Sequence, residues 1–474
     1  MVLQLREQEG TGAVASLRAN ALSEIEAMAL SVAQIGPAIE VIFVVGAIGA
    51  VVGVGAPLIV LVAGLGYLLH ANTTAEFSNS VVSAGGYTAY MEAAFTRRAG
   101  RYAGVLFVLG FSGIAAGFLL LVALWSQTAV MGIFSVMLPW PFYFVVLSVG
   151  LGLIMLRGVV VSSLVAISLF AFELAVVLSG LGVMLVNSAS HLTLSAFSFA
   201  SVHGSAGIAI AFPLAIFMFV GASNPAPMSE EIGNPRHSVA QAVLVAVVFA
   251  TGLFVVASVA IDASYKNSAT LLGKVAFPFI SAPGVKGSPL VDLIYIAGFT
   301  SVCAIFLAGF NAGARVIFSL ARRGMLPPVL AHTNRWQVPG VAIGVAVVIW
   351  GVGGLIAGSV LGLVGGFSDI AGVGSDVYVI LLISVNVALL RFFLAKKASV
   401  QRRSNAWGVT RNIIFPLAGS VVLGYPLWES IKPGAVGFAG WDWVVCVACF
   451  AAGCLAWLWP GTGTIRNPVR VEEE

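Results

Sequence analysis

The chemically informative side chains of this sequence are carboxylates that stand alone in long apolar runs. Glu40 follows Gly36 and Pro37 in the run SVAQIGPAIEVIF, and Glu173 lies in SLFAFELAVVL. An ionised carboxylate in hydrocarbon is costly, so each group must be protonated, paired or beside water. A carboxyl group that gains and loses a proton can couple a proton gradient to transport, and an ionised one can bind an amine.

The helix that carries Glu40 is predicted to be broken at Gly36-Pro37. Without water in the bilayer core, unpaired backbone groups are tolerated only where they line a cavity or pack on protein. A second Gly- and Pro-rich run, FPLAIFMFVGASNPAP at 212–227, stands half-way along the chain. Two discontinuous helices in corresponding halves indicate an inverted-repeat transporter with a midplane site; the competing interpretation is that Gly and Pro only kink two ordinary spans. The predicted substrate-binding residues are Ile35, Gly36, Pro37, Ala38, Ile39, Glu40, Phe217, Phe219, Val220, Gly221, Ala222 and Ser223.

The composition is that of a membrane protein. Of 474 residues, 59% are hydrophobic and 9% charged, with a mean hydropathy of +1.04, whereas soluble domains carry roughly 25% charged residues. Apolar runs of membrane-spanning length recur and no strand-like alternation competes with them, so the fold is predicted to be all-α with about twelve transmembrane helices. The expected spans are 27–50, 54–80, 101–130, 139–156, 159–186, 205–229, 239–262, 290–320, 338–357, 369–394, 412–431 and 441–459.

These spans predict one membrane domain with a five-plus-five inverted repeat, in which helices one and six are broken. The expected parts are a cytoplasmic N-terminal segment 1–25, a transporter domain 26–460 with repeats at about 26–187 and 204–395, two further helices within 412–459, and a cytoplasmic tail 461–474. If both termini are cytoplasmic, only Lys266, Lys274, Lys286 and Lys432 fall on the outer side, as the positive-inside rule requires. A multi-pass protein of the cytoplasmic (plasma) membrane is therefore expected.

Other function classes find no support in the sequence. Cys446 and Cys449 form a C-x-x-C pair inside an apolar helix, and the five histidines show neither i, i+4 spacing nor an HExxH motif, so no metal site is predicted. Hydrolase, nucleotide and dinucleotide motifs do not occur. We therefore expect no enzyme and no cofactor. We also expect no nucleic-acid partner, because the net charge of +4 reflects membrane topology.

Three motifs give the chain a family resemblance. Residues 83–90, SAGGYTAY, resemble a SAGGxYxY segment, with Val82 where a proline is usual. Gly221 followed by EEIGNPR at 230–236 resembles the pattern G-x-(E/D) and then EExxNPR. Residues 311–327, NAGARVIFSLARRGMLP, resemble the signature NAxxRxxYAxARDGxLP. In this order and spacing the motifs resemble the amino acid permease family of the amino acid, polyamine and organocation (APC) transporter superfamily, over residues 25–460.

The resemblance implies roles for several residues. In this family the helix-five position of Glu173 often holds a lysine or carboxylate that faces helices one and eight, where Ser301 is expected; Glu173 and Ser301 are thus predicted to couple protons, with a purely structural Glu173 as the competing interpretation. A further candidate carboxylate is Asp376. Opposite charges at cytoplasmic helix ends are predicted to latch a gate, unless they only snorkel to the interface: Glu230, Glu231, Arg315 and Arg322.

The first break departs from the family pattern G-x-G-I-F. Pro37 removes a backbone donor, and an ionised Glu40 would repel a substrate carboxylate near the half-helix N-terminus. An amine without a carboxylate, or a substrate with a second cationic group, then fits better than a neutral amino acid. The alternative is that Glu40 points away from the cavity, paired or neutral.

The predicted function is secondary active transport of an amino acid or small organic amine by alternating access, coupled to protons. The alternatives are exchange of two solutes, a sodium-coupled or ion-transporting member of the same fold, and a membrane sensor that binds solute without moving it. The expected partners are the small-molecule substrate and the lipid bilayer, with the protein a monomer or homodimer.

Overall fold

The computed structural model describes residues 17–202, 211–212, 214–275, 277–395, 406–432 and 442–458. The expected N-terminal segment up to residue 16, the start of the second repeat at 204–210 and the tail 461–474 lie outside these residues. Within them, seven helical stretches are long and apolar enough to cross a membrane, judged by length and composition. They are Glu24–Ser78, Arg97–Phe134, Leu164–Asn187, Pro235–Ser264, Leu290–Arg322, Gly340–Leu394 and Ala406–Ile431.

Two of these stretches are too long for a single crossing. Glu24–Ser78 and Gly340–Leu394 each hold 55 residues, which would extend about 80 Å as one straight helix against a hydrocarbon core of about 30 Å. Glycines with positive φ interrupt both, namely Gly36 and Gly53 in the first and Gly362 in the second. Each of these two stretches is therefore long enough to cross a membrane more than once, and the described residues hold more possible spans than the seven stretches suggest.

The first stretch begins with a capping box, in which Ser23 and Glu26 each bond the other's backbone N–H. It divides into α1 (Glu24–Ile35), α2 (Pro37–Ile39), the π-helical η2 (Glu40–Val44), α3 (Val45–Val52) and α4 (Ala56–Ser78). The following helices are α5 (Tyr87–Ala94), α6 (Arg97–Phe134), α7 (Trp140–Leu156), α8 (Val159–Asn187), the 3₁₀ segment η7 (Ala226–Glu231), α10 (Pro235–Ser264), α11 (Ala269–Leu272), α12 (Pro278–Ser281) and α13 (Leu290–Arg322). The last are α14 (Gly340–Leu394), α16 (Ala406–Val409), the π-helical η9 (Thr410–Ile414), α17 (Phe415–Ile431) and α18 (Asp442–Leu458).

The structure corrects one predicted connection. Spans 338–357 and 369–394 were expected with a loop between them, but α14 is helical throughout except at Gly362, with φ 78° and ψ 170°. The intervening sequence GSVLGLVGGFS has no cluster of polar turn residues, so nothing favours a longer loop and one glycine makes the turn.

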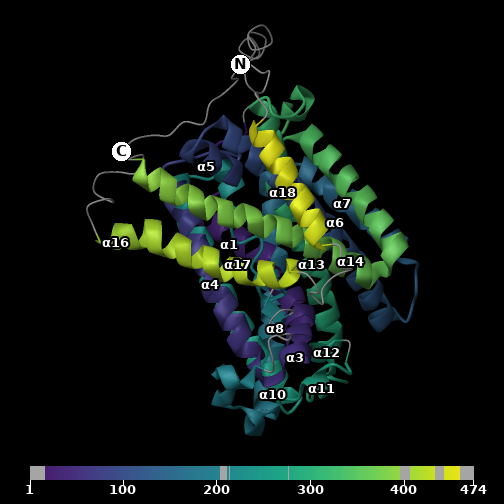
Figure 1. The fold of residues 1–474 in the computed structure, drawn as a ribbon. Coiled ribbons are helices and arrows are strands. Elements are labelled where there is room, and N and C mark those ends of the chain that lie inside the picture. Colours follow the sequence, from purple (N-terminus) through teal and green to yellow (C-terminus); the bar gives the residue numbers. More distant parts are fainter. Residues whose placement is uncertain are drawn as a thin grey trace.

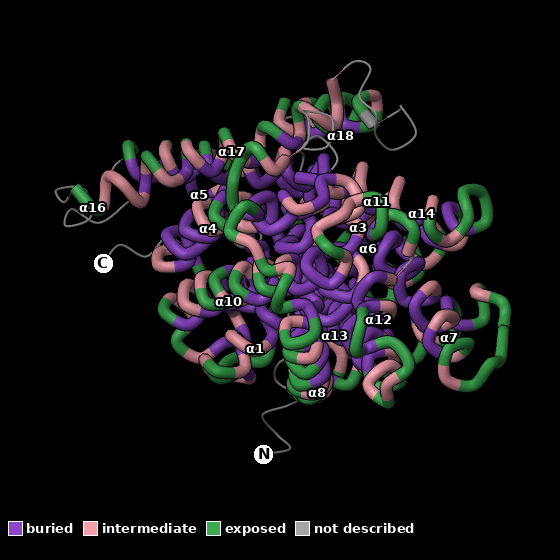
Figure 2. The backbone as a smooth tube through the Cα atoms, turned by 90° about the horizontal axis from the view of Figure 1, so that it is seen from below, coloured by how far each residue is buried: buried purple, intermediate pink, exposed green. Residues whose placement is uncertain are grey.

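The helices form one bundle with a buried centre. Buried residues lie in the middle and exposed residues along the outer helices (Figure 2). α6 packs along α14, and a Cβ on Gly374 of α14 would lie 2.6 Å from the backbone N of Ile114 and 2.7 Å from the carbonyl O of Gly110. Close backbone approach at small residues is how membrane helices associate. α11 and α12 lie at the end of the bundle opposite α5 (Figure 1).

Candidate functional site

The first break lies at Gly36, between α1 and α2. Gly36 has φ 65° and ψ 58°, a left-handed conformation that favours glycine. A Cβ atom there would lie 2.0 Å from Cδ1 of Ile305 on α13, so a side chain would also require Ile305 to move. Pro37 opens α2, where its missing N–H is tolerated because first-turn donors have no partner within their own helix. The interruption thus falls at the two residues that the sequence indicates.

The second break lies at residues 218–225, where the chain forms turns between a short helical segment and η7. Gly221 has φ 110°, and a Cβ on it would lie 2.8 Å from Cγ of Gln34. The Ser31 hydroxyl on α1 donates a 2.6 Å hydrogen bond to the carbonyl O of Ala222. The two breaks are therefore in direct contact, although they are far apart in the sequence.

Glu173 lies beside the first break. Its side chain is buried, and within the described residues neither carboxylate oxygen makes a hydrogen bond of good geometry. Its polar neighbours are the Ser301 hydroxyl and the backbone N–H of Ala38, and Ser301 in turn accepts a 3.3 Å hydrogen bond from the N–H of Ile39. The structure therefore brings Glu173 and Ser301 together at the N-terminus of α2, where the sequence places them by resemblance.

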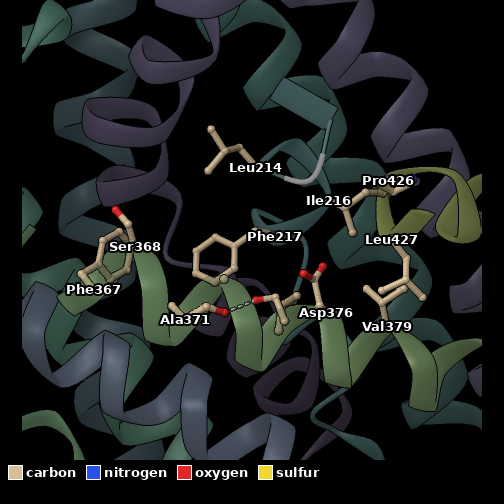
Figure 3. A pocket seen from close by; sticks show the side chains of 13 residues that line it. Leu214, Ile216, Phe217, Phe367, Ser368, Ala371, Asp376, Val379, Pro426 and Leu427 are labelled. Carbon is tan, nitrogen blue, oxygen red and sulfur yellow. Dashed lines mark hydrogen bonds between the residues drawn. The ribbon is translucent and has the colours of Figure 1, made fainter. Parts of the chain in front are cut away.

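A cavity of about 70 Å³ lies between the second break, α14 and α17 (Figure 3). Phe217 and Val220 line it, whereas the other predicted substrate-binding residues lie at the breaks and do not. Its walls are mainly apolar, and the charged group among its lining residues is Asp376. Ser430 donates a 2.5 Å hydrogen bond to Oδ2 of Asp376, so this candidate carboxylate is held between α14 and α17.

Glu40 lies in η2, four residues after the break, and is only 1% exposed. Its Oε2 makes no hydrogen bond within the described residues, and Glu40 is not a lining residue of the 70 Å³ cavity. The structure thus places Glu40 in the protein interior, near the first break and outside the lining of that cavity.

The four predicted gate residues form two ion pairs of different burial. Arg315 and Glu231, both with fully buried side chains, make a two-pronged contact that includes a 3.0 Å bond from Nη2 to Oε1. Arg315 also donates from Nη1 to the carbonyl O of Asn311 at 2.9 Å. Arg322 donates from Nη1 to Oε2 of Glu230 at 2.9 Å and from Nη2 to Oε1. The side chains of Arg322 and Glu230 are 16% and 21% exposed.

A third ion pair adds to these two. Arg323 donates from Nη1 to Oε2 of Glu92 at 2.7 Å and also bonds Thr88, both on α5. The N–H of Ala84 donates to Oε1 of Glu230 at 2.8 Å. The segment 83–94 is thereby tied to the end of α13 and to η7, at one end of the bundle.

The comparisons with known proteins decide the family. A model of the amino acid permease family matches residues 28–456. The chain belongs to the amino acid permease family. Membership makes it a multi-pass membrane transporter and not an enzyme, and it implies an amino acid substrate. No curated protein sequence matches this permease.

Solved structures show the fold of the permease in other proteins. A manganese transporter of Eremococcus coleocola, in complex with an aromatic bis-isothiourea substituted compound, matches with a TM-score of 0.54 and 13% identity, over 95% of this chain and 98% of that one. A single-residue variant of that transporter matches with a TM-score of 0.54 and 12% identity, over 92% and 93%. At such identities the likeness concerns the fold alone.

Sequence reasoning missed several residues of this site. Gln34 lies against both Gly221 and Gly309, because a Cβ on either glycine would meet its side chain at 2.8 Å, and Ser31 joins the two breaks. Both stand among apolar residues of α1 and give no sequence motif. Glu92 is flanked by alanines and Met91, and a charge in such a short helix does not reveal its partner. The signal available for Gln34 was its place immediately before a predicted break.

Proposed function

We propose that the permease moves an amino acid or small organic amine across the cytoplasmic membrane by alternating access, in symport with protons. The proposed arrangement is twelve spans with a five-plus-five inverted repeat at about 26–187 and 204–395, two further helices within 412–459, and both termini in the cytoplasm. The observation that carries the proposal is the pair Glu173 and Ser301 at the N-terminus of α2. A buried carboxyl group beside a helix break has the chemistry to exchange a proton as the break rearranges.

The same geometry supports a cationic substrate. Ile39 donates its N–H to Ser301, and the N–H of Ala38 faces Glu173. These are the first-turn donors that would otherwise hold a substrate carboxylate. Since Ser301 occupies the first donor and a carboxyl group lies beside the second, we infer that an ammonium or second cationic group contributes most of the recognition, with Glu40 as its acidic partner.

The three ion pairs support a gate at the proposed cytoplasmic end. Glu230, Glu231 and Glu92 sit on η7 and α5, whereas their arginines sit together at the end of α13. If η7 and α5 move away from α13 as the inner side opens, these pairs must separate and re-form once per cycle. The manganese named for the structural relatives belongs to those proteins, because identities of 12–13% relate the folds alone.

Transport in proteoliposomes tests the function. A thermal-shift screen of the purified protein against amino acids, polyamines and simple amines identifies ligands, since a compound that binds the folded state raises its apparent stability. We expect such a ligand to show counterflow and to accumulate under an inward proton gradient without sodium, and an uncoupler to abolish accumulation. Stoichiometric trapping of the ligand without counterflow would instead identify a sensor, and dependence on sodium would refute proton coupling.

Glu40→Gln tests the substrate contact. If Glu40 binds an ammonium group, the variant should weaken cationic ligands by about 1.5 to 3 kcal/mol, the range for a hydrogen bond to a charged group, and spare zwitterionic ligands without a second amine. Competition of each class against counterflow measures the difference. Equal weakening of all ligands, or of none, would mean that Glu40 does not touch the substrate.

A further inference from the structure

A second buried carboxylate lies far from the site described above. Asp262, in the last turn of α10, is 1% exposed, and within the described residues neither of its carboxylate oxygens has a hydrogen-bond partner. α10 begins at Pro235, four residues after Glu231 of the buried ion pair. Asp262 follows 27 residues later, about 40 Å away at 1.5 Å per residue. It therefore lies at the opposite end of the fold from the ion pairs.

Asp262 packs against the backbone of α3 and near an apolar side chain of α11. A Cβ on Gly49 of α3 would lie 2.7 Å from Oδ1 of Asp262 and 3.0 Å from Cδ1 of Leu272 on α11. The carboxyl group is therefore packed between α3, α10 and α11, and α3 and α11 contact each other (Figure 1). Gly49 leaves just enough space for it, because any side chain at that position would collide with the carboxyl group.

Among the described residues, no side chain forms an ion pair with Asp262. His191, in η4 (Ala189–His191), which packs against α10, is half-exposed and accepts a hydrogen bond from Asn267 through its backbone carbonyl O. The residues of α3 and α11, VGAIGAVV and ATLL, hold no titratable side chain. On the chain that follows Asp262, Tyr265 donates its hydroxyl to the carbonyl O of Pro278, and Lys266 and Lys274 are exposed.

The carboxylates of two elements that pack near Asp262 lie well away along their helices. Glu40 is nine residues before Gly49, about 13 Å. Glu173 is 15 residues, about 22 Å, before Ser188, whose hydroxyl donates to that of Ser264, two residues after Asp262.

We propose that Asp262 is a second proton-binding site, on the outer side of the transporter, and that its proton holds α3 against α10. A protonated carboxyl group is tolerated in this apolar contact, whereas an ionised one requires water or a cation. A sodium ion would need several oxygen ligands, and Gly49 and Leu272 offer no side-chain oxygen. Loss of the proton therefore favours separation of α3 and α11 from α10, which admits water to the carboxylate.

The position of α3 makes it suited to such a movement. It is joined to the rest of the chain through the π-helical η2 on one side and through Gly53, with φ 62° and ψ −137°, on the other. A short helix between two irregular joints can tilt without unfolding its neighbours. The role of this site in transport rests on the proposed function. In that cycle, external protons would close the outer side behind a bound substrate, while Glu173 couples the proton at the centre.

Hydrogen–deuterium exchange of the full-length protein in detergent micelles tests the site without any substrate. After correction for intrinsic exchange, amides of α3 and α11 should exchange about tenfold more slowly at about pH 5 than at about pH 8. Asp262→Asn should keep them slow at both pH values, because the amide is neutral throughout. Gly49→Ala should keep them fast at both, because its methyl group displaces the carboxyl group. Asp292→Asn, which removes an exposed carboxylate of α13, is the control and should retain the difference.

A wild-type protein without the pH difference would overturn the proposal, and so would an Asp262→Asn variant that keeps it. If Asp262→Asn does not fold, Asp262→Leu replaces it and should also keep both helices protected. The readout involves no transport. Loss of proton-driven uptake with an intact exchange difference would therefore refute the proposed function and leave the Asp262 site standing.

Discussion

Glu173→Gln is expected to abolish accumulation driven by a pH gradient and to leave counterflow measurable. A neutral amide imitates the protonated carboxyl group in size and hydrogen bonding but cannot release a proton. One pH unit is worth about 1.4 kcal/mol, so symport with one proton allows about tenfold accumulation per pH unit. The variant should instead equilibrate its substrate across the membrane, with no accumulation at any imposed gradient.

The measurement is uptake of the ligand found by thermal shift, into proteoliposomes with an acidic exterior, alongside counterflow in the same preparation. Glu24→Gln serves as the matched control, because Glu24 on α1 has a side chain that is 39% exposed, and it should accumulate substrate as the wild-type protein does. Ser301→Ala removes the hydroxyl that accepts from Ile39 and should weaken uptake while keeping its dependence on the gradient. Unchanged pH-driven accumulation in Glu173→Gln would contradict the coupling role.

The breaks could be predicted from sequence because they depend on local backbone chemistry. Position 36 has a left-handed conformation, which glycine adopts readily, and Pro37 lacks a backbone N–H. Both properties follow from the residue type alone. Gly362 was missed because one glycine in an apolar run, with polar residues absent nearby, resembles a packing glycine such as Gly374. The distinction depends on which neighbours approach the backbone, and this is a tertiary property.

The partners of the charged groups could not be predicted in the same way. The sequence indicates that Glu230 and Glu231 face arginines at the end of α13, but consecutive residues of a 3₁₀ turn point in different directions. Which glutamate enters the interior therefore depends on how η7 packs against α13. Asp262 gave no signal in the sequence, since its burial depends on contact with α3, which lies more than 200 residues earlier, and with α11, which folds back after the end of α10. Long-range packing, and not composition, separates these cases.

Arg315→Met is expected to destabilise the fold by about 3 to 5 kcal/mol, because it leaves Glu231 buried without its counter-charge. Both side chains are fully buried, and Arg315 also bonds the carbonyl O of Asn311. Methionine keeps most of the apolar stem and little of the polar network. The second pair provides the control: Arg322→Met should cost about 1 kcal/mol or less, because Arg322 and Glu230 are partly exposed and partly solvated.

Stability and gating can be separated by restoring neutrality on both sides of the buried pair. The double variant Arg315→Met, Glu231→Leu removes both charges, and replacing a buried ion pair by apolar groups is often neutral or stabilising. Its unfolding midpoint in detergent should therefore recover most of the loss seen for Arg315→Met alone. If the pair is a latch that must open in each cycle, the double variant should fold but transport at an altered rate, since the energy of separating the charges has been removed.

A single variant as stable as the wild-type protein would contradict the buried pairing. A double variant with both normal stability and normal transport would leave the Arg315–Glu231 pair without a gating role, and assign the gate to the more exposed pairs of Arg322 and Arg323.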